Sequence, residues 1–211
     1  MKNLTLDDIK NDYLMLKSEG LFLEHVNRFD YFLQQIESEW ERYMNLISSH
    51  EIKFGMEIGT WGGGSFSTLT NVASDDATLL TLDLHEGMFK TLEDKGIGLK
   101  MLKKYNQNVF VRNYDSHDES SVSWTKEILG ENKLDYLFID GDHSYDGVKE
   151  DFYKYSPFVK DGGIISFHDI QPHGKGSQVD IFWREIKQLY EHIEIIENPN
   201  QTWAGIGILY K

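Results

Sequence analysis

The sequence contains no cysteine and only three prolines among its 211 residues. Without cysteine the chain can form no disulfide, no thiolate metal site and no cysteine nucleophile. No apolar run reaches the length of a membrane span, and the first twenty residues mix both charges without the apolar core of a signal peptide. These absences predict a cytoplasmic protein that does not enter a membrane.

Basic residues are also scarce, with 21 Lys and Arg against 35 Asp and Glu, a formal charge of −14. A field of this sign repels phosphate backbones, so nucleic acid is not an expected partner. It suits cationic ligands or divalent metals, although a solvated acidic surface gives the same composition. The 40% hydrophobic and 13% aromatic content is that of an ordinary globular protein.

From Lys53 onward, short apolar runs alternate with amphipathic ones. Strands are predicted at 53–58, 78–83, 108–112, 134–139, 163–167, 192–197 and 204–210, and helices near 65–73, 87–104, 118–129, 145–157 and 179–191. This alternation predicts an α/β fold, a doubly wound and mostly parallel seven-stranded sheet covered on both faces. The loop ENPNQTW between the last two strands is too short for a crossover helix, which predicts an antiparallel hairpin at the sheet edge.

Residues 1–50 are expected to form a helical extension to the main domain, residues 51–211. Thr5 with Asp8 resembles an N-capping box, and apolar residues recur at helical spacing from about Phe29 to Ile47. Three explanations of this apolar stripe stay open. It packs into the core, it shapes a substrate pocket, or it contacts a second copy of the chain in a homo-oligomer.

The stretch KFGMEIGTWGGGSF, residues 53–66, predicts a buried strand, a tight turn and the start of a helix. Residues without Cβ allow unusual dihedral angles and let a ligand approach the backbone closely. A dinucleotide fingerprint needs glycine at i, i+2 and i+5, but Trp61 or Ser67 occupies one of these places. The chain also lacks a GxxxxGK[ST] stretch, so neither a dehydrogenase nor a P-loop enzyme is favoured.

Acidic and imidazole side chains end or directly follow nearly every predicted strand. They include Glu57, Asp83, His85, Asp115, Asp140, Asp142, His143, His168 and Asp169. In a doubly wound sheet, ligands bind at the carboxyl ends of the strands, where the strand order reverses. We therefore expect these residues to surround one cleft. Asp83 is placed to accept hydrogen bonds from the hydroxyls of a ribose, or else to cap the helix that follows it.

Three stretches of the sequence carry a family resemblance. Glu57-Ile-Gly-Thr-Trp-Gly-Gly-Gly-Ser65 resembles motif I of class I S-adenosylmethionine-dependent methyltransferases, in the aromatic variant of metal-dependent enzymes related to catechol O-methyltransferase. The stretches 138–148 (FIDGDHSYDGV) and 160–170 (KDGGIISFHDI) resemble the branch with macrolide-sugar O-methyltransferases and cephalosporin-hydroxylase-like proteins. The resemblance covers roughly residues 50–211 and implies the Rossmann-like class I methyltransferase fold.

The resemblance also implies a set of residues that bind S-adenosylmethionine. Glu57, Gly59 and Ser65 would contact its methionine portion, Asp83 its ribose, and Asp115 with Ser116 its adenine edge. Trp61, Gly63 and Asp140 complete the implied set. The cofactor is a sulfonium cation without phosphates, so a site rimmed by carboxylates suits it.

By the same resemblance, Asp140, His168 and Asp169 would bind a divalent metal, Mg²⁺ or Mn²⁺. Relatives more often have Asp-Asn or Glu-Asp at the second site, so His168 departs from the pattern and would shift the preference toward a transition ion. Consecutive side chains on a strand point to opposite faces, so His168 and Asp169 can both bind only if the chain bends there. A hydrogen-bonded core histidine is the alternative for His168.

The energetics of methylating an alcohol favour a metal. An aliphatic hydroxyl has a pKa near ~15.7, and ionising it at neutral pH costs up to about 12 kcal/mol. A positioned general base typically contributes roughly 3–5 kcal/mol. His143 is the candidate base because the ordinary pKa of histidine suits proton transfer near pH 7. It would otherwise be the histidine that begins the helix SYDGVKEDF.

The leading expectation is therefore metal-assisted methyl transfer to a hydroxyl of a small molecule, a sugar or a natural product. Two alternatives stay open. One is a metal-independent methyltransferase in which His143 or His173 acts alone, and the other is a catalytically silent module that only binds the cofactor.

Overall fold

The computed structural model describes residues 35–61, 63–84, 103–104, 106–173 and 176–211. The described helices are α3 (Glu37–Ile47), α4 (Gly64–Val72), α6 (Glu119–Leu129), α7 (Tyr145–Tyr155) and α8 (Val179–Ile186), with the 3₁₀ turns η2 (Ser156–Phe158) and η3 (Lys187–Leu189). The strands are β1 (Phe54–Ile58), β2 (Thr78–Asp83), β3 (Asn108–Asn113), β4 (Leu134–Ile139), β5 (Val159–Phe167), β6 (Glu191–Ile195) and β7 (Ile206–Tyr210). Residues 1–34 of the predicted extension and most of the helix predicted near 87–104 lie outside the described residues.

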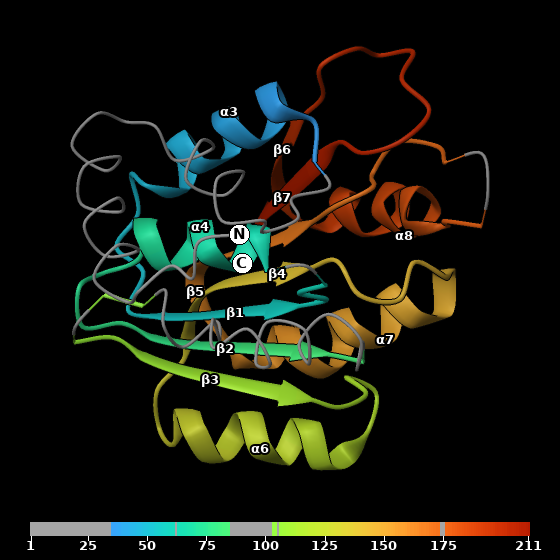
Figure 1. Ribbon diagram of the computed structural model, residues 1–211. Helices are drawn as coiled ribbons and strands as arrows, with labels where there is room; N and C mark the ends of the chain where they lie inside the picture. The colour runs from blue at the N-terminus through green and yellow to red at the C-terminus, as the bar shows by residue number, and fades with distance from the viewer. Residues whose placement is uncertain (1–34, 62, 85–102, 105, 174–175) are drawn as a thin grey trace, which may run out of the picture.

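The strands form one seven-stranded sheet in the order β3-β2-β1-β4-β5-β7-β6 (Figure 1). The pairs β2–β3, β1–β2, β1–β4 and β4–β5 are parallel, whereas β7 is antiparallel to both β5 and β6. The prediction of a doubly wound, mostly parallel sheet with an antiparallel hairpin at its edge is confirmed. The strand order reverses between β1 and β4, which is where this architecture binds ligands.

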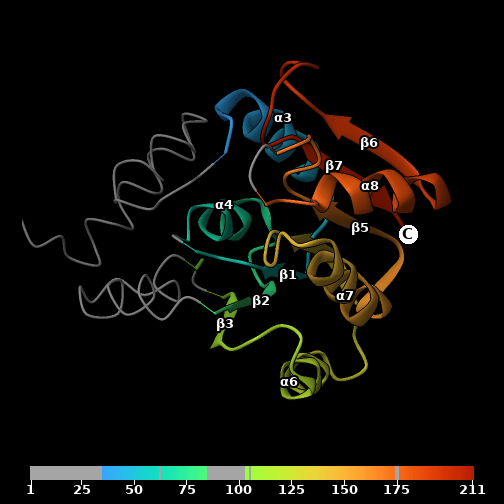
Figure 2. The same ribbon diagram turned by 90° about the vertical axis from the view of Figure 1, so that its right-hand side faces the viewer.

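Helices cover both faces of the sheet (Figure 2). On one face α3 and α4 contribute Trp40 and Phe66 to a core cluster, and on the other α6, α7 and α8 pack around Phe152 and Trp183. From Tyr136 to Ile139 the side chains of β4 alternate between the two clusters, because successive residues of a strand point to opposite faces. Among the described residues, no helix combines the length and the apolar character needed to span a bilayer.

A buried carboxylate joins α3 to the loop between β6 and β7. Glu39 is 0% exposed, and its Oε1 accepts hydrogen bonds from Glu197 N (2.8 Å) and Gln201 Nε2 (2.7 Å). Its Oε2 accepts from Gly205 N at 2.9 Å. The neighbouring Ala204 N donates to Asp169 Oδ1 (2.9 Å), so α3 helps to hold the residues that follow β5. The division into an extension, residues 1–50, and a main domain stays a prediction.

We expect Glu39→Ala to lower the free energy of unfolding by about 2–5 kcal/mol, because it leaves buried backbone donors unpaired. Chemical denaturation measures this change. Glu37→Ala, an exposed glutamate of the same helix, is the matched control and should change stability by less than about 0.5 kcal/mol. Equal effects of the two substitutions would contradict the structural role of Glu39.

Candidate functional site

A cleft of about 590 Å³ opens at the carboxyl ends of the parallel strands. Its volume is in the usual range for sites that bind small molecules. Ten of the predicted cofactor, metal and catalytic residues line it, together with Asp142 and His173: Gly59, Trp61, Ser65, Asp83, Asp115, Ser116, Asp140, His143, His168 and Asp169. The structure thus brings together side chains that come from most of the sequence between β1 and the end of β5.

Backbone hydrogen bonds continue past the ends of the strands and align the residues that follow them. Gly59 N donates to Leu82 O (2.9 Å), Asp140 N to Ile58 O (2.8 Å), and His168 N to Ile139 O (3.2 Å). These bonds extend the ladders β2–β1–β4–β5 by one residue each. The rim of the cleft is therefore as firmly positioned as the sheet itself.

Gly59 has a packing role in this rim. Its φ of +86° lies in the left-handed region, and a Cβ at this position would lie 1.9 Å from the carbonyl oxygen of Asp140. Any side chain here would push Asp140 out of place. Glycine is therefore required for the contact between the ends of β1 and β4, whether or not a ligand also approaches it.

Two predicted site residues do not line the cleft. Glu57 is 1% exposed and accepts a hydrogen bond from Ser65 Oγ, so it lies behind Ser65. Burial raises the pKa of Glu57 well above its ordinary value, the bond from Ser65 opposes this, and the nearby Asp140 and Asp83 raise it further. Gly63, at φ +77°, is the N-cap of α4. A direct contact of either residue with a ligand stays a prediction.

Asp83 ends β2 and holds the glycine-rich turn. Its Oδ2 accepts a hydrogen bond from the backbone N of Trp61, which has a positive φ of 38°. The carboxylate thus fixes the turn that follows β1 while it faces the cleft. The alternative role of Asp83, as a cap for the next helix, concerns residues outside those the structure describes.

Two carboxylates and two imidazoles form a charged cluster at the centre of the cleft. Asp140 Oδ1 lies 3.2 Å from His143 Nε2 and 3.3 Å from His168 Nδ1. Asp169 Oδ2 lies 3.3 Å from His143 Nδ1, and its Oδ1 is 3.5 Å from His168 Nδ1. The strand ends at Phe167 and Asp169 has a φ of +60°, so the chain bends there. This bend lets the side chains of His168 and Asp169 both enter the charged cluster.

The cluster changes the protonation of its members. The hydrogen bond from His143 to Asp140 raises the pKa of His143 to about 9, against the opposing effect of burial. Burial would raise the pKa of Asp140, but His168 and His143 outweigh it and lower that pKa to about 2. Burial likewise opposes the charged form of His168, yet Asp140 raises its pKa above the ordinary value. With this pKa the His143 ring is protonated at neutral pH and is not poised to accept a proton.

The cluster has the donor types of a divalent-cation site. Carboxylate oxygens and imidazole nitrogens suit Mn²⁺ and related ions, and His168 Nε2 is buried with no hydrogen-bond partner in the described part of the chain. As the side chains stand, no three histidine or acidic residues among those described are arranged to hold a metal. The His143 ring lies between Asp140 and Asp169, in contact with both. Charged His143 thus serves as an internal cation for the two carboxylates.

Sequence reasoning missed several residues of the cleft, among them Gln35, Thr60, His117 and Trp203. His117 directly follows Asp115 and Ser116, so the rule of strand ends would have found it if extended by one residue. Gln35 and Trp203 come from segments outside the strand–helix repeats. No local pattern marks them. Gln35 Nε2 donates to Asp140 Oδ2 at 3.4 Å, and the bonds of Glu39 hold the loop that carries Trp203.

We expect Asp140→Asn to lower the pKa of His143 from about 9 toward its ordinary value, because the substitution removes the carboxylate that raises it. Side-chain NMR titration of the ligand-free protein with a chelator present measures this pKa. Asp142→Asn is the matched control, since Asp142 contributes least among the causes given for His143. A pKa that stays near 9 in Asp140→Asn would contradict the described pairing.

Comparison with known proteins places these features in context. The family model described as "Methyltransferase domain" matches residues 56–170, which include β1 to β5 and the charged cluster. An uncharacterized protein of Acanthamoeba polyphaga mimivirus is 30% identical over 146 residues, 66% of this chain. The chain spans about 61% of the length of that relative.

Solved structures share the fold at low sequence identity. An O-methyltransferase from Bacillus cereus in complex with S-adenosylhomocysteine matches with a TM-score of 0.60 and 16% identity, over 98% of this chain and 90% of that one. The O-methyltransferase TomG from Streptomyces achromogenes, in complex with S-adenosylmethionine, matches at 0.57 and 15%, over 92% and 89%. The N-methyltransferase NodS from Bradyrhizobium japonicum, in complex with S-adenosylhomocysteine, matches at 0.57 and 12%, over 86% and 89%.

Proposed function

The chain belongs to the methyltransferase-domain family, with the fold of class I methyltransferases, and we propose that it transfers a methyl group from S-adenosylmethionine to a hydroxyl of a small molecule. One observation carries this proposal. Asp83 ends β2, whereas Asp115 and Asp140 follow β3 and β4, yet all three line the same cleft. The structural neighbours in complex with S-adenosylmethionine or S-adenosylhomocysteine support this choice of cofactor.

The cleft suits a cationic nucleoside. Asp83 would accept hydrogen bonds from the ribose hydroxyls, and Asp115 with Ser116 would meet the adenine edge. Gly59, Trp61 and Ser65 would contact the methionine portion, with Glu57 and Gly63 behind them. A sulfonium cation gains electrostatic stabilisation from carboxylates, and more so in a cleft that excludes water.

The transfer itself requires one bond to form and one to break. The acceptor oxygen attacks the methyl carbon, the bond from this carbon to sulfur breaks, and the hydroxyl proton must leave. His143 is the proposed base. In the ligand-free protein it is already protonated, but a cation that enters the cleft competes for Asp140 and Asp169 and so lowers the pKa of His143. The base would thus become available when the cofactor is bound.

Asp140, His168 and Asp169 would hold a divalent cation, Mg²⁺ or Mn²⁺, which would supply Lewis acidity toward the acceptor hydroxyl. The donor types of the cluster support this assignment, as does the cost of ionising an alcohol. A metal-independent transfer with His143 alone is the second candidate, and the contact of the His143 ring with both carboxylates favours it.

The acceptor would bind near Gln35, His173 and Trp203, which line the cleft with His143. Gln35 Oε1 and His173 Nδ1 are buried polar atoms without a hydrogen-bond partner in the described residues. An aromatic ring beside unsatisfied polar groups suits an acceptor rich in hydroxyls, such as a sugar or a natural product. The lack of cysteine fits a cytoplasmic setting.

We expect a chelator to abolish methyl transfer and Mg²⁺ or Mn²⁺ to restore it. Asp140→Ala should lose metal binding but keep its affinity for S-adenosylhomocysteine within a few-fold, because Asp83 and the adenine edge are unchanged. Asp146→Ala, an exposed aspartate in the first turn of α7, is the control. Isothermal titration and a methyl-transfer assay over a panel of hydroxyl acceptors measure both effects. Transfer that is insensitive to chelation would favour the metal-independent candidate.

We expect Asp83→Asn to weaken binding of S-adenosylhomocysteine by about ten- to a hundredfold, since charge-assisted hydrogen bonds to the ribose are lost. Asp76→Asn, in an exposed turn before β2, is the matched control. Calorimetry on both variants measures the change. If the unaltered chain binds no S-adenosylhomocysteine, the proposed function is rejected. If it binds the cofactor but methylates none of the acceptors, it is a silent binding module.

A further inference from the structure

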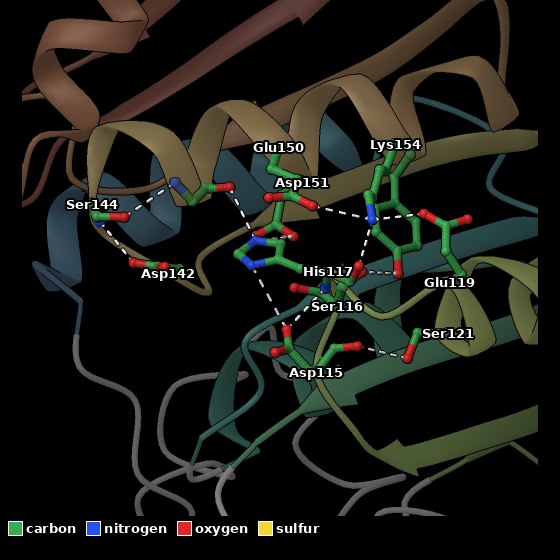
Figure 3. Close-up of polar contacts among 12 residues, drawn as sticks. Asp115, Ser116, His117, Glu119, Ser121, Asp142, Ser144, Glu150, Asp151 and Lys154 are labelled. Atoms are coloured by element: carbon green, nitrogen blue, oxygen red, sulfur yellow. Dashed lines mark hydrogen bonds and ion pairs between the residues drawn. The ribbon is translucent and has the colours of Figure 1, made fainter.

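The loop after β3 is anchored by its backbone. The carbonyl oxygen of Asp115 accepts from Ser121 Oγ (2.7 Å), that of Ser116 from Tyr155 OH (2.7 Å), and that of His117 from Lys154 Nζ (Figure 3). These donors belong to α6 and α7. The backbone of residues 115–117 is therefore held without any help from the His117 ring, which leaves the ring for another role.

The His117 ring connects a carboxylate of the cleft with a buried one. Its Nε2 lies 3.3 Å from Asp151 Oδ1 and 3.2 Å from Gly147 O, on the first turns of α7. Its Nδ1 lies 3.7 Å from Asp115 Oδ1 (Figure 3). Both ring nitrogens thus face acceptors, an arrangement that only the doubly protonated ring can satisfy.

Asp151 is unusual because it is a carboxylate that is 0% exposed. A buried carboxylate is costly unless a cation pairs with it, and the His117 ring is in contact with it. Burial raises the pKa of Asp151, the hydrogen bonds of His117 and Ser116 oppose this rise, and the nearby Asp142 adds to it. Nothing in the methyl-transfer chemistry proposed above uses Asp151.

We propose that Asp151 and His117 form a positioning pair that directs the carboxylate of Asp115 at the exocyclic amine of adenine. The pair would make the cleft selective for 6-aminopurine nucleosides over 6-oxopurine nucleosides. This inference rests on the proposed function, because it assumes that the cofactor's adenine lies beside Asp115.

The chemistry of Asp115 supports this selectivity. Its Oδ1 accepts from the backbone N of His117 (2.9 Å) and faces the charged ring, so Oδ2 is the atom available to a ligand. An exocyclic amine donates to a carboxylate, whereas a 6-oxo group presents a second acceptor and is repelled. Sites built around such polar groups reject analogues that cannot satisfy them.

The charge of the His117 ring depends on its surroundings. The hydrogen bond to Asp151 raises the pKa of His117 to about 9, burial opposes this, and Glu150 and Asp115 add to the increase. Lys154 on α7 and Glu119 on α6 also lie nearby, paired with each other. Below about pH 9 the ring is charged and attracts Asp115. Above it, one nitrogen carries a lone pair that faces a carboxylate, and this attraction is lost.

The test uses the full chain and 5′-methylthioadenosine as the probe, because this nucleoside lacks the amino-acid portion and does not reach all of the charged cluster. Calorimetry at pH 7 compares it with 5′-methylthioinosine, and a pH series from 6 to 10 follows the amine-bearing probe alone. We expect the unaltered chain to prefer 5′-methylthioadenosine by about tenfold or more at pH 7. Its affinity should fall several-fold as the pH rises through about 9.

Two substitutions separate positioning from a merely structural role. His117→Gln should weaken binding of 5′-methylthioadenosine about tenfold at pH 7, reduce the preference over the 6-oxo probe, and abolish the decrease near pH 9. Asp151→Asn should move the midpoint of that decrease from about 9 toward the ordinary histidine value of about 6.5. His192→Gln, on β6 at the opposite edge of the sheet, is the matched control. It should change neither the preference for 5′-methylthioadenosine nor the pH dependence of its binding.

The outcomes are distinct. Unchanged selectivity and an unchanged pH dependence in His117→Gln would overturn the positioning pair, and so would a midpoint that stays near 9 in Asp151→Asn. If His117→Gln fails to fold, the midpoint in Asp151→Asn decides the question. A chain that binds neither 5′-methylthioadenosine nor S-adenosylhomocysteine would reject the proposed function together with this inference. If the chain binds S-adenosylhomocysteine but His117→Gln changes neither the affinity for 5′-methylthioadenosine nor its pH dependence, this inference alone is rejected.

Discussion

The hydrogen bonds that join the ends of four parallel strands are the constraint on which the rest of the structure depends. They set Gly59, Asp140 and His168 side by side, each one residue beyond its strand. The contact between β1 and β4 tolerates no side chain at Gly59, because a Cβ there would overlap the backbone of Asp140. A loop could place the same side chains, but it could not hold them with the rigidity of the sheet.

Charge balance is the second organising feature of the cleft. Carboxylates from several strands meet in a partly buried space, and histidines supply the compensating charge in the ligand-free protein. His143 pairs with Asp140 and Asp169, and His117 pairs with Asp151 and faces Asp115. A cationic ligand that enters such a site replaces an internal cation and so alters the protonation of the histidines. The same balance would couple cofactor binding to the release of the proposed base.

Most of the described fold was predictable because buried parallel strands leave a strong pattern. The predicted bounds of β2 and β4 agree with the structure to the residue, since each is a mostly apolar run with an aspartate at its end or directly after it. β5 begins at Val159, four residues before its predicted start. The polar stretch Lys160–Gly163 has no strand pattern, but Gly162 and Gly163 exchange hydrogen bonds with Lys211. Such pairing joins distant parts of the chain and leaves no local signal.

The sequence by itself determined which side chains follow each strand, and hence that Asp83, Asp115, Asp140 and Asp169 would share one edge of a sheet, because strand ends are local features. Tertiary structure decided the protonation of the histidines that lie beside these carboxylates. Asp140 raises the pKa of His143 and Asp169, distant in the sequence, adds to this rise, whereas the pKa of His117 depends on a carboxylate buried in α7. Gln35 and Trp203 reach the cleft only through the fold. Electrostatic interactions act through space over a few ångströms, so distances between residues far apart in the chain decide them.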